Sequence, residues 1–232
     1  MPDIEEALIA WQTTLCKEVD VGRLIARSPS AHKWKAPWRA LLLREAVAWR
    51  LVDLMQQSVQ LHKAKHVLGA RILVRSAFET LGMLIYSNQD IRRVVANELN
   101  FHEFSKRTSQ LLLGSRDKTT NLVSINILTV LQRADKRFPG LLGWYEALCE
   151  SAHPNYEGML AGYSSNDSTE FITTFENRWD AMYGTSHLGS IKACAAVFDA
   201  EYNHEWPDAF DKLEKWIEAN DEMLERSQPT EC

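Results

Sequence analysis

The sequence predicts an all-α protein: a single helical bundle of about seven to nine helices with no significant sheet. Apolar residues recur at three- and four-residue spacing along most of the 232-residue chain. Proline, glycine and short polar runs interrupt this spacing at intervals typical of helix ends. The only stretch with two-residue alternation, residues 123–130, is followed by charges that restore helical spacing. We therefore expect one all-α domain over residues 1–232.

The first half of the chain predicts three helices. Asp3 can cap a helix whose apolar face carries Ile4, Leu8, Trp11 and Leu15. Residues 27–37 break the periodicity and indicate a loop. Pro37 then fits the first turn of a long helix over 38–63. After a break at 63–66, residues 67–86 are apolar on most sides, which is typical of a central helix.

The second half predicts shorter helices between polar breaks. Residues 87–90 supply a stop and a new cap, so a helix is expected over 91–113. Further helices are expected over these ranges: 124–138, 141–152, 171–182, 187–201 and 206–226. Residues 155–170 indicate an irregular loop that could act as a lid, and residues 227–232 a frayed tail.

The composition excludes several classes of protein. Hydrophobic residues at 45% and charged residues at 25% are ordinary for a globular chain. A net charge of −5 argues against a duplex-DNA binder, although a local basic patch remains compatible with it. Four scattered cysteines favour neither a thiolate zinc site nor a disulfide framework. With no signal peptide and no long apolar run, we expect a cytoplasmic protein with no membrane partner.

Three charged residues on the expected central helix form the first candidate site. Arg71, Arg75 and Glu79 are spaced four apart and therefore project from one face. Buried charges persist only when they are paired, so an internal salt bridge between helices is one interpretation. The other is a binding site in which the guanidinium groups hold a phosphate or another anion.

The end of the 141–152 helix is the second candidate site. His153 precedes Pro154, and a protonated His is favourable at a helix C-terminus for purely structural reasons. Asn155 could serve as a cap by its side chain or by a left-handed backbone. Alternatively, His153 is a general acid or base, with Glu150 one turn earlier and with Tyr145 or Tyr156 nearby.

These two segments resemble a family of uncharacterised bacterial all-helical proteins. The residues concerned are RSAFETLGMLIY, from Arg75, and YEALCESAHPNYEGML, from Tyr145. In that family a helix with Arg and Glu precedes a Tyr-x-x-Leu-(Ser/Cys)-Glu-x-x-His-Pro segment. The resemblance covers about residues 38–163.

The family is in turn similar to HEPN domains, many of which are RNases in toxin–antitoxin and phage-defence systems. HEPN enzymes carry Arg, four to six residues and then His on one helix. His153 matches that His, but no Arg precedes it on its own helix, so Arg75 would supply the charge from a neighbouring helix. The resemblance thus implies a stress or phage-defence protein that acts on or binds RNA or nucleotides, without a cofactor. His153, Glu150 and Arg75 would be catalytic in a metal-independent RNase-like reaction. The remaining residues named above, Arg71, Glu79, Tyr145, Asn155 and Tyr156, would bind the ligand.

Two further interpretations stay open. The first is a non-enzymatic helical module that binds a protein partner, such as an antitoxin, or forms a homo-oligomer. The second is a di-metal carboxylate bundle, because the spacing Glu-x-x-His occurs twice and such bundles use it twice. The ligands would then be Glu79, Glu150, His153, Glu176, Glu201 and His204.

Overall fold

The computed structural model describes residues 3–228, and helices dominate this range as the sequence predicts. The expected tail therefore lies, from residue 229 onward, outside the described residues. Within 3–228 there are eleven α-helices, two π-helices and one two-stranded sheet, so the helices outnumber the predicted seven to nine. The α-helices are α1 (Ile4–Thr14), α2 (Val21–Arg27), α3 (Pro29–His32), α4 (Lys35–Lys63), α5 (Val67–Val95), α6 (Phe101–Leu113), α7 (Ile127–Arg137), α8 (Leu141–Ala152), α9 (Trp179–Tyr183), α10 (His187–Asp199) and α11 (Trp206–Arg226). The other elements are η1 (Tyr156–Ala161), η2 (Ala200–Glu205), β1 (Ser164–Asp167) and β2 (Ile172–Phe175).

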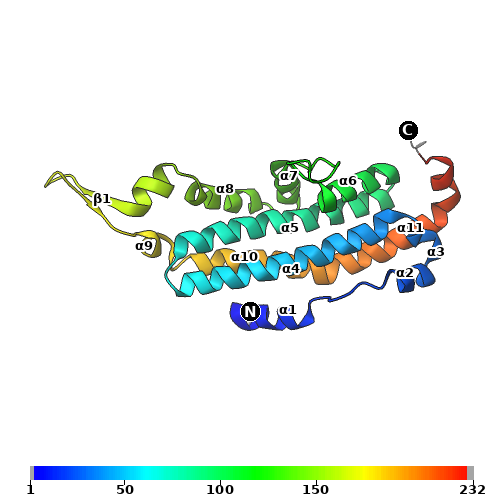
Figure 1. Ribbon diagram of the computed structural model, residues 1–232, viewed down its shortest axis with the longest axis horizontal. Coiled ribbons are helices and arrows are strands. Elements are labelled where there is room, and N and C mark those ends of the chain that lie inside the picture. Colours follow the sequence, from blue (N-terminus) through cyan, green and yellow to red (C-terminus); the bar gives the residue numbers. More distant parts are fainter. Residues whose placement is uncertain (1–2, 229–232) are drawn as a thin grey trace. The chain divides into compact units, whose positions relative to one another are not determined.

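The described chain divides into two compact units that share its longest helices. Of the described residues, unit 1 comprises 3–14, 49–81 and 134–197, and unit 2 comprises 15–48, 82–133 and 198–228. Helices α4, α5, α7 and α10 each contribute residues to both units. Figure 1 shows α4 and α5 as the two longest helices of the chain. The expectation of a single domain stays a prediction.

Unit 1 has an apolar core to which the first half of α5 and the whole length of α8 contribute. The largest fully buried side chains of this unit are Leu8, Leu51, Met55, Phe78, Leu81, Leu141 and Trp179. Seen along the sequence, they recur at helical spacing, for example Leu51 with Met55 and Phe78 with Leu81. This core fixes α8 against α5, and that pair positions the candidate site.

Unit 2 has its own core and also buries several acidic side chains. Its core includes Leu84, Ile85, Ile91, Phe104 and Leu131. The Asp90 carboxylate is buried and accepts a hydrogen bond of 2.8 Å from Arg133 Nη2. Arg107 Nη1 lies 3.4 Å from the same carboxylate oxygen. Burial of this carboxylate is tolerable because arginines from two helices pair with it.

The predicted break at residues 87–90 is wrong, because α5 runs through it to Val95. Ser87, Asn88 and Asp90 are residue types that usually favour turns and caps. In the structure all three are buried within the helix. Asn88 Nδ2 donates to Glu201 Oε2 at 2.7 Å, so its amide is bonded to a distant partner. Tertiary bonds thus outweigh the local preference, and α6 begins only at Phe101.

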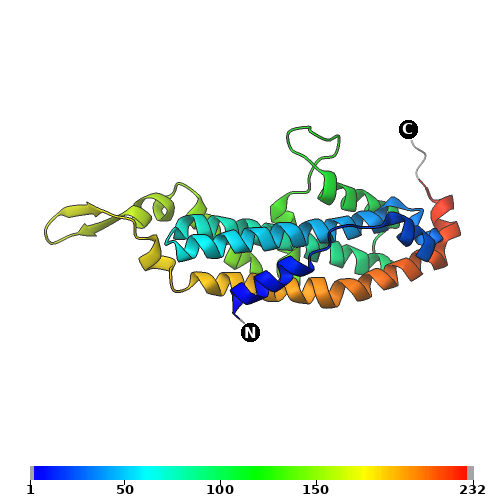
Figure 2. The same cartoon turned by 60° about the horizontal axis from the view of Figure 1, so that its bottom comes forward.

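The expectation of no sheet is also corrected, at residues 164–175. The 155–170 segment, expected to be irregular, contains the π-helix η1 and the strand β1. Residues 172–175, expected to be helical, form β2, and only Trp179–Tyr183 is helical in the 171–182 range. The two strands pair antiparallel, with Ser164 opposite Phe175 and Asp167 opposite Ile172. In unit 1 this hairpin projects away from α8 and α9 (Figures 1 and 2).

The loop expected over 27–37 is also more regular than predicted, since it contains α3 and the start of α4. Pro37 lies in the first turn of α4, as expected. Among residues 3–228, no helix is both long enough and apolar enough to span a bilayer.

Candidate functional site

Helices α5 and α8 lie antiparallel, and the charged face of α5 points at α8. Arg71 reaches Ser151, near the end of α8, whereas Glu79 reaches Tyr145, one turn from its start. Arg75 lies between them and bonds to Cys149. The four-residue spacing predicted this shared face correctly.

Arg75, Glu79 and Tyr145 form a closed polar cluster. Arg75 Nη2 lies 3.1 Å from Glu79 Oε1 and donates to the Tyr145 hydroxyl at 2.9 Å. That hydroxyl donates in turn to Glu79 Oε1 at 2.9 Å. Arg75 Nε donates to Cys149 Sγ at 3.1 Å. The salt bridge of this cluster lies within α5 and not between helices, and the hydrogen bonds to Tyr145 and Cys149 join it to α8.

The chemistry of this cluster favours a structural role for its tyrosine. Burial, followed by hydrogen bonds with Cys149 and Glu79, raises the pKa of Tyr145. The hydroxyl therefore stays protonated near neutral pH and acts as a donor to Glu79. A proton acceptor in a reaction would need the opposite shift.

Arg71 occupies the buried end of the same face. Only 5% of this residue is exposed, and burial lowers the pKa of its guanidinium. Arg71 Nε donates to Ser151 Oγ at 2.7 Å, and Nη2 donates to the carbonyl of Ala147 at 3.0 Å. The guanidinium carbon lies 3.7 Å from the centroid of the Tyr183 ring. This planar cation is thus held by bonds on its edges and an aromatic ring on its face.

The same guanidinium joins the two ends of the segment that leaves α8 and returns at α9. Ser151 Oγ donates onward to Glu157 Oε1 at 2.7 Å, on η1. Burial and a hydrogen bond to Glu157 raise the pKa of Tyr183, on α9. Arg71, Ser151, Glu157 and Tyr183 therefore form one network across the outgoing and returning chain. We call this network the clamp.

We call residues 156–175 the arm, which the clamp holds at its base. Further contacts close that base: Arg178 Nη1 donates to the carbonyl of Ser164 at 2.6 Å. Trp179 is completely buried. A Cβ at Gly162 would lie 2.6 Å from atoms of the Trp179 ring, so only glycine fits there without displacement.

The tip of the arm is a well-formed turn. Asp167 Oδ1 accepts from the backbone N–H groups of Thr169 at 2.8 Å and Glu170 at 3.1 Å. These bonds lower the pKa of Asp167, so its carboxylate is ionised. Phe171 closes the turn with φ of 53°, a left-handed conformation that is unfavourable for a bulky residue.

The arm exposes an unusual share of apolar surface. Seven of the seventeen exposed large apolar side chains of the described residues lie in it. Phe171 is 93% exposed, Phe175 79% and Tyr156 75%. The others are Met159, Leu160, Tyr163 and Ile172. Every residue of β2 is exposed, so both faces of this strand are open.

His153, Glu150, Asn155 and Tyr156 lie at the foot of the arm. His153 ends α8 with an extended backbone, and its exposed side chain makes no hydrogen bond or ion pair with Arg75 in the described part of the chain. Asn155 has an extended backbone and is not left-handed. Its Oδ1 accepts from Gly158 N at 2.9 Å, and its Nδ2 donates to Glu150 Oε2 at 2.6 Å. The structure thus joins Glu150 to Asn155.

The six residues of the metal hypothesis do not come together as a site. Glu201 is fully buried and bonded to Asn88, and His204 pairs with Asp199 at 3.8 Å. Glu176 is exposed just after β2. Across residues 3–228, no three His, Cys, Asp or Glu side chains group in a way that could hold a metal ion.

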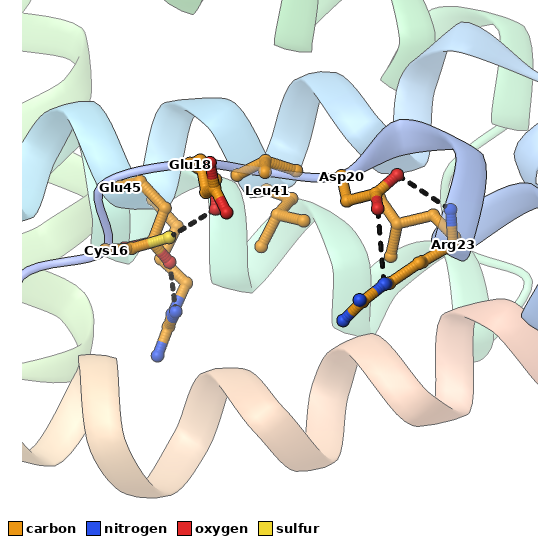
Figure 3. A pocket seen from close by; sticks show the side chains of 9 residues that line it. Cys16, Glu18, Asp20, Arg23, Leu41 and Glu45 are labelled. Carbon is orange, nitrogen blue, oxygen red and sulfur yellow. Dashed lines mark hydrogen bonds and ion pairs between the residues drawn. The ribbon is translucent and has the colours of Figure 1, made fainter.

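A separate cavity of about 460 Å³ lies in unit 2 (Figure 3). Most of its charged groups are engaged with one another. Asp20 pairs with Arg23 at 3.2 Å, and Glu45 is bonded by Arg44 and by the Tyr202 hydroxyl, the latter at 2.7 Å. Asp20, Arg23, Arg44 and Glu45 are thus paired, while the buried Arg44 Nε has no hydrogen-bond partner among the described residues.

The residues that the sequence analysis missed are those of the arm, above all Phe171 and Phe175. The segment SSNDSTEFITTF, from Ser164, carries the signals of a hairpin: turn-forming Asn166, Asp167 and Ser168, then a strand rich in aromatic and β-branched residues. Because each strand has only four residues, the alternation of side chains is too short to stand out in the sequence. No protein-family model, curated protein or solved structure matches this chain.

Proposed function

We propose that this protein is a non-enzymatic helical module that binds a partner through the arm. The observation that carries the proposal is the exposure of seven large apolar side chains within residues 156–175. Such surface is costly to leave in water, and monomers rarely keep it without a binding role. Aromatic residues also dominate the binding energy of protein interfaces.

The clamp supports this function because it fixes the direction of the arm. Its buried guanidinium holds Glu157 through Ser151 on the outgoing side and stacks on Tyr183 on the returning side. A docking element that is already ordered loses less conformational entropy on binding. In this proposal, the charged residues of α5 are structural, and Arg71 is a positioning residue.

The experiment compares partners recovered with the parent and with Phe171→Asn/Phe175→Ser. Asn tolerates the left-handed backbone at position 171, so the variant keeps the turn. Val123→Ser is the matched control, because Val123 is also exposed, at 72%, but lies in a loop outside the arm. Quantitative mass spectrometry of affinity-purified material should show specific proteins lost from the arm variant and kept in the control. Identical recoveries from all three would contradict the docking function.

A second candidate, the HEPN-like reaction on RNA or nucleotides, is favoured by one observation. Arg75 bonds to Cys149, and His153 follows Cys149 by one turn at the end of the same helix. Cys149 and His153 lie four residues apart, a helical rise of about 6 Å, and this candidate requires that a phosphate fits between Arg75 and His153. His153 would act as acid or base and Arg75 would stabilise phosphate charge. Release of RNA fragments by the parent but not by His153→Ala would support this candidate.

A further inference from the structure

We infer that the partner of the arm is a protein whose contact surface combines an apolar pocket with Lys or Arg side chains at its rim. This inference rests on the docking function proposed above and adds the chemistry of the occupant. It follows from the charge of the arm, from the geometry of its tip, and from the poor fit of a second copy.

The arm is uniformly acidic. Residues 156–175 contain Glu157, Asp167 and Glu170 and no Lys, Arg or His. Glu176 follows β2 directly. The clamp bonds Glu157, but the carboxylates of Asp167, Glu170 and Glu176 are exposed around the exposed rings of Phe171 and Phe175. An apolar centre with charges at its edge is the usual anatomy of a protein interface.

This charge selects among classes of partner. Nucleic acids and anionic membranes present phosphates, which the carboxylates of the arm would repel. A surface with Lys or Arg at its rim would attract them, and such complementarity both accelerates association and excludes wrong partners. A basic protein surface is therefore the class that the arm fits.

A second copy of this chain fits less well. Antiparallel pairing of two β2 strands about a two-fold axis can set Phe171 of one copy against Phe175 of the other. The same register sets Glu170 of each copy against Glu176 of the other. Like charges directly opposite each other destabilise a strand pair.

The geometry of the tip indicates which side chain of the arm enters the apolar pocket of the partner. The turn bonds of Asp167 fix the backbone, and Phe171 is held in a left-handed conformation at the end of the hairpin. Strain of this kind is retained where the position of a side chain is used. Phe171 is thus the anchor, and Phe175 lies on β2 behind it.

The test selects short random peptides on the immobilised full chain, with counter-selection on Phe171→Asn/Phe175→Ser. Selected peptides are synthesised, and their affinity is measured for the parent and for Asp167→Asn/Glu170→Gln/Glu176→Gln. Asparagine keeps the Oδ1 acceptor of the turn, so this charge variant retains its tip. We expect peptides that combine Lys or Arg with aliphatic or aromatic residues. Their affinity should fall about tenfold or more in the charge variant, and also when salt rises from about 50 to about 300 mM.

Other outcomes separate failure of this inference from failure of the docking function. Peptides that need the two phenylalanines but not the carboxylates would overturn the basic partner and leave docking intact. Binding of the parent, but not of the phenylalanine variant, to phosphatidylcholine vesicles would replace the partner with a lipid surface. Concentration-dependent dimers in sedimentation, lost in that variant, would replace it with a second copy. If no peptide, vesicle or self-association depends on the two phenylalanines, both proposals fall.

Discussion

The guanidinium carbon of Arg71 lies 3.7 Å from the centroid of the Tyr183 ring, which joins the N-terminal part of α5 to α9, the helix that follows the arm. From its edge, the same guanidinium donates a hydrogen bond to Ser151, whose hydroxyl donates in turn to Glu157 at the start of the arm. A residue that the sequence marks only as a charge in an apolar helix thus orders a segment more than eighty positions further along the chain. The proposed docking function depends on this link between core and arm.

Arg71→Met should destabilise unit 1 and loosen the arm. The change removes two hydrogen bonds, and the buried Ser151 hydroxyl loses the donor that it accepts from. We expect a loss of about 2–4 kcal/mol in the free energy of unfolding. Denaturant titration measures it, and limited proteolysis should cut faster within 156–175. Arg116→Met, at an exposed loop residue, is the control and should change neither.

Gly162→Ala and Gly143→Ala should have opposite effects on stability. The added Cβ at Gly162 meets the buried Trp179 ring at 2.6 Å, whereas at Gly143, on α8, nothing lies within 4 Å. The first change should cost about 1–3 kcal/mol by overpacking. The second should gain up to about 1 kcal/mol, because alanine favours a helix more than glycine does. Thermal unfolding of the two variants and the parent measures these changes. A Gly162→Ala protein as stable as the parent would contradict the close packing of Gly162 against Trp179.

Stability should fall between about pH 6.5 and 4 because of His187. Ser58 Oγ donates to the carbonyl of Ala70, so the 2.9 Å contact between Ser58 and His187 requires that His187 Nε2 donates. Burial, and then the positive charges of His62 and Arg71, lower the pKa of His187 to about 4. Between these two pH values His187 binds a proton in the unfolded chain but not in the folded chain. The free energy of unfolding therefore decreases as pH falls through this window.

The full loss of stability, reached below pH 4, should be about 3 kcal/mol. The measurement is the free energy of unfolding from pH 7.5 to 4 for the parent and for His187→Asn. The difference between the two proteins isolates this histidine from carboxylates that titrate in the same range. Parallel curves for the two proteins would show that His187 is not the cause.

His153→Ala should leave stability within about 0.5 kcal/mol of the parent, because the side chain is exposed. A larger loss, measured by denaturant titration, would show that His153 supports the end of α8. If stability is unchanged, RNA cleavage by the two proteins then tests the second candidate function directly. Equal activity of parent and variant would remove His153 from any reaction.

The parts of the fold that were predictable from the sequence are those set by local signals. Helix α8 was predicted at both ends, because Pro139-Gly140 precedes it and His153-Pro154 follows it. The extension of α5 through Asn88 and Asp90 was not predictable, because it depends on Glu201 and Arg133, far away in the sequence. Local preference cannot anticipate such partners.

Of the candidate site, too, one part was predictable from the sequence and another was not. The four-residue spacing of Arg71, Arg75 and Glu79 predicted a shared face, and helix geometry alone guarantees it. That spacing carries no information about which groups fill the face. The stack on Tyr183 and the bond to Ser151 arise from packing between α5, α8 and α9. The arm was misread because its strands are short and its apolar residues have no buried face to align with.

The most direct test of the docking function places a photoreactive phenylalanine analogue at position 171 of the full chain in cells. The same analogue at Val123 is the control for exposed apolar surface. A docking role predicts one or a few identified proteins crosslinked at position 171 and not at position 123, in a yield that falls when Arg71→Met loosens the arm. Adducts of equal kind and yield at the two positions would contradict it.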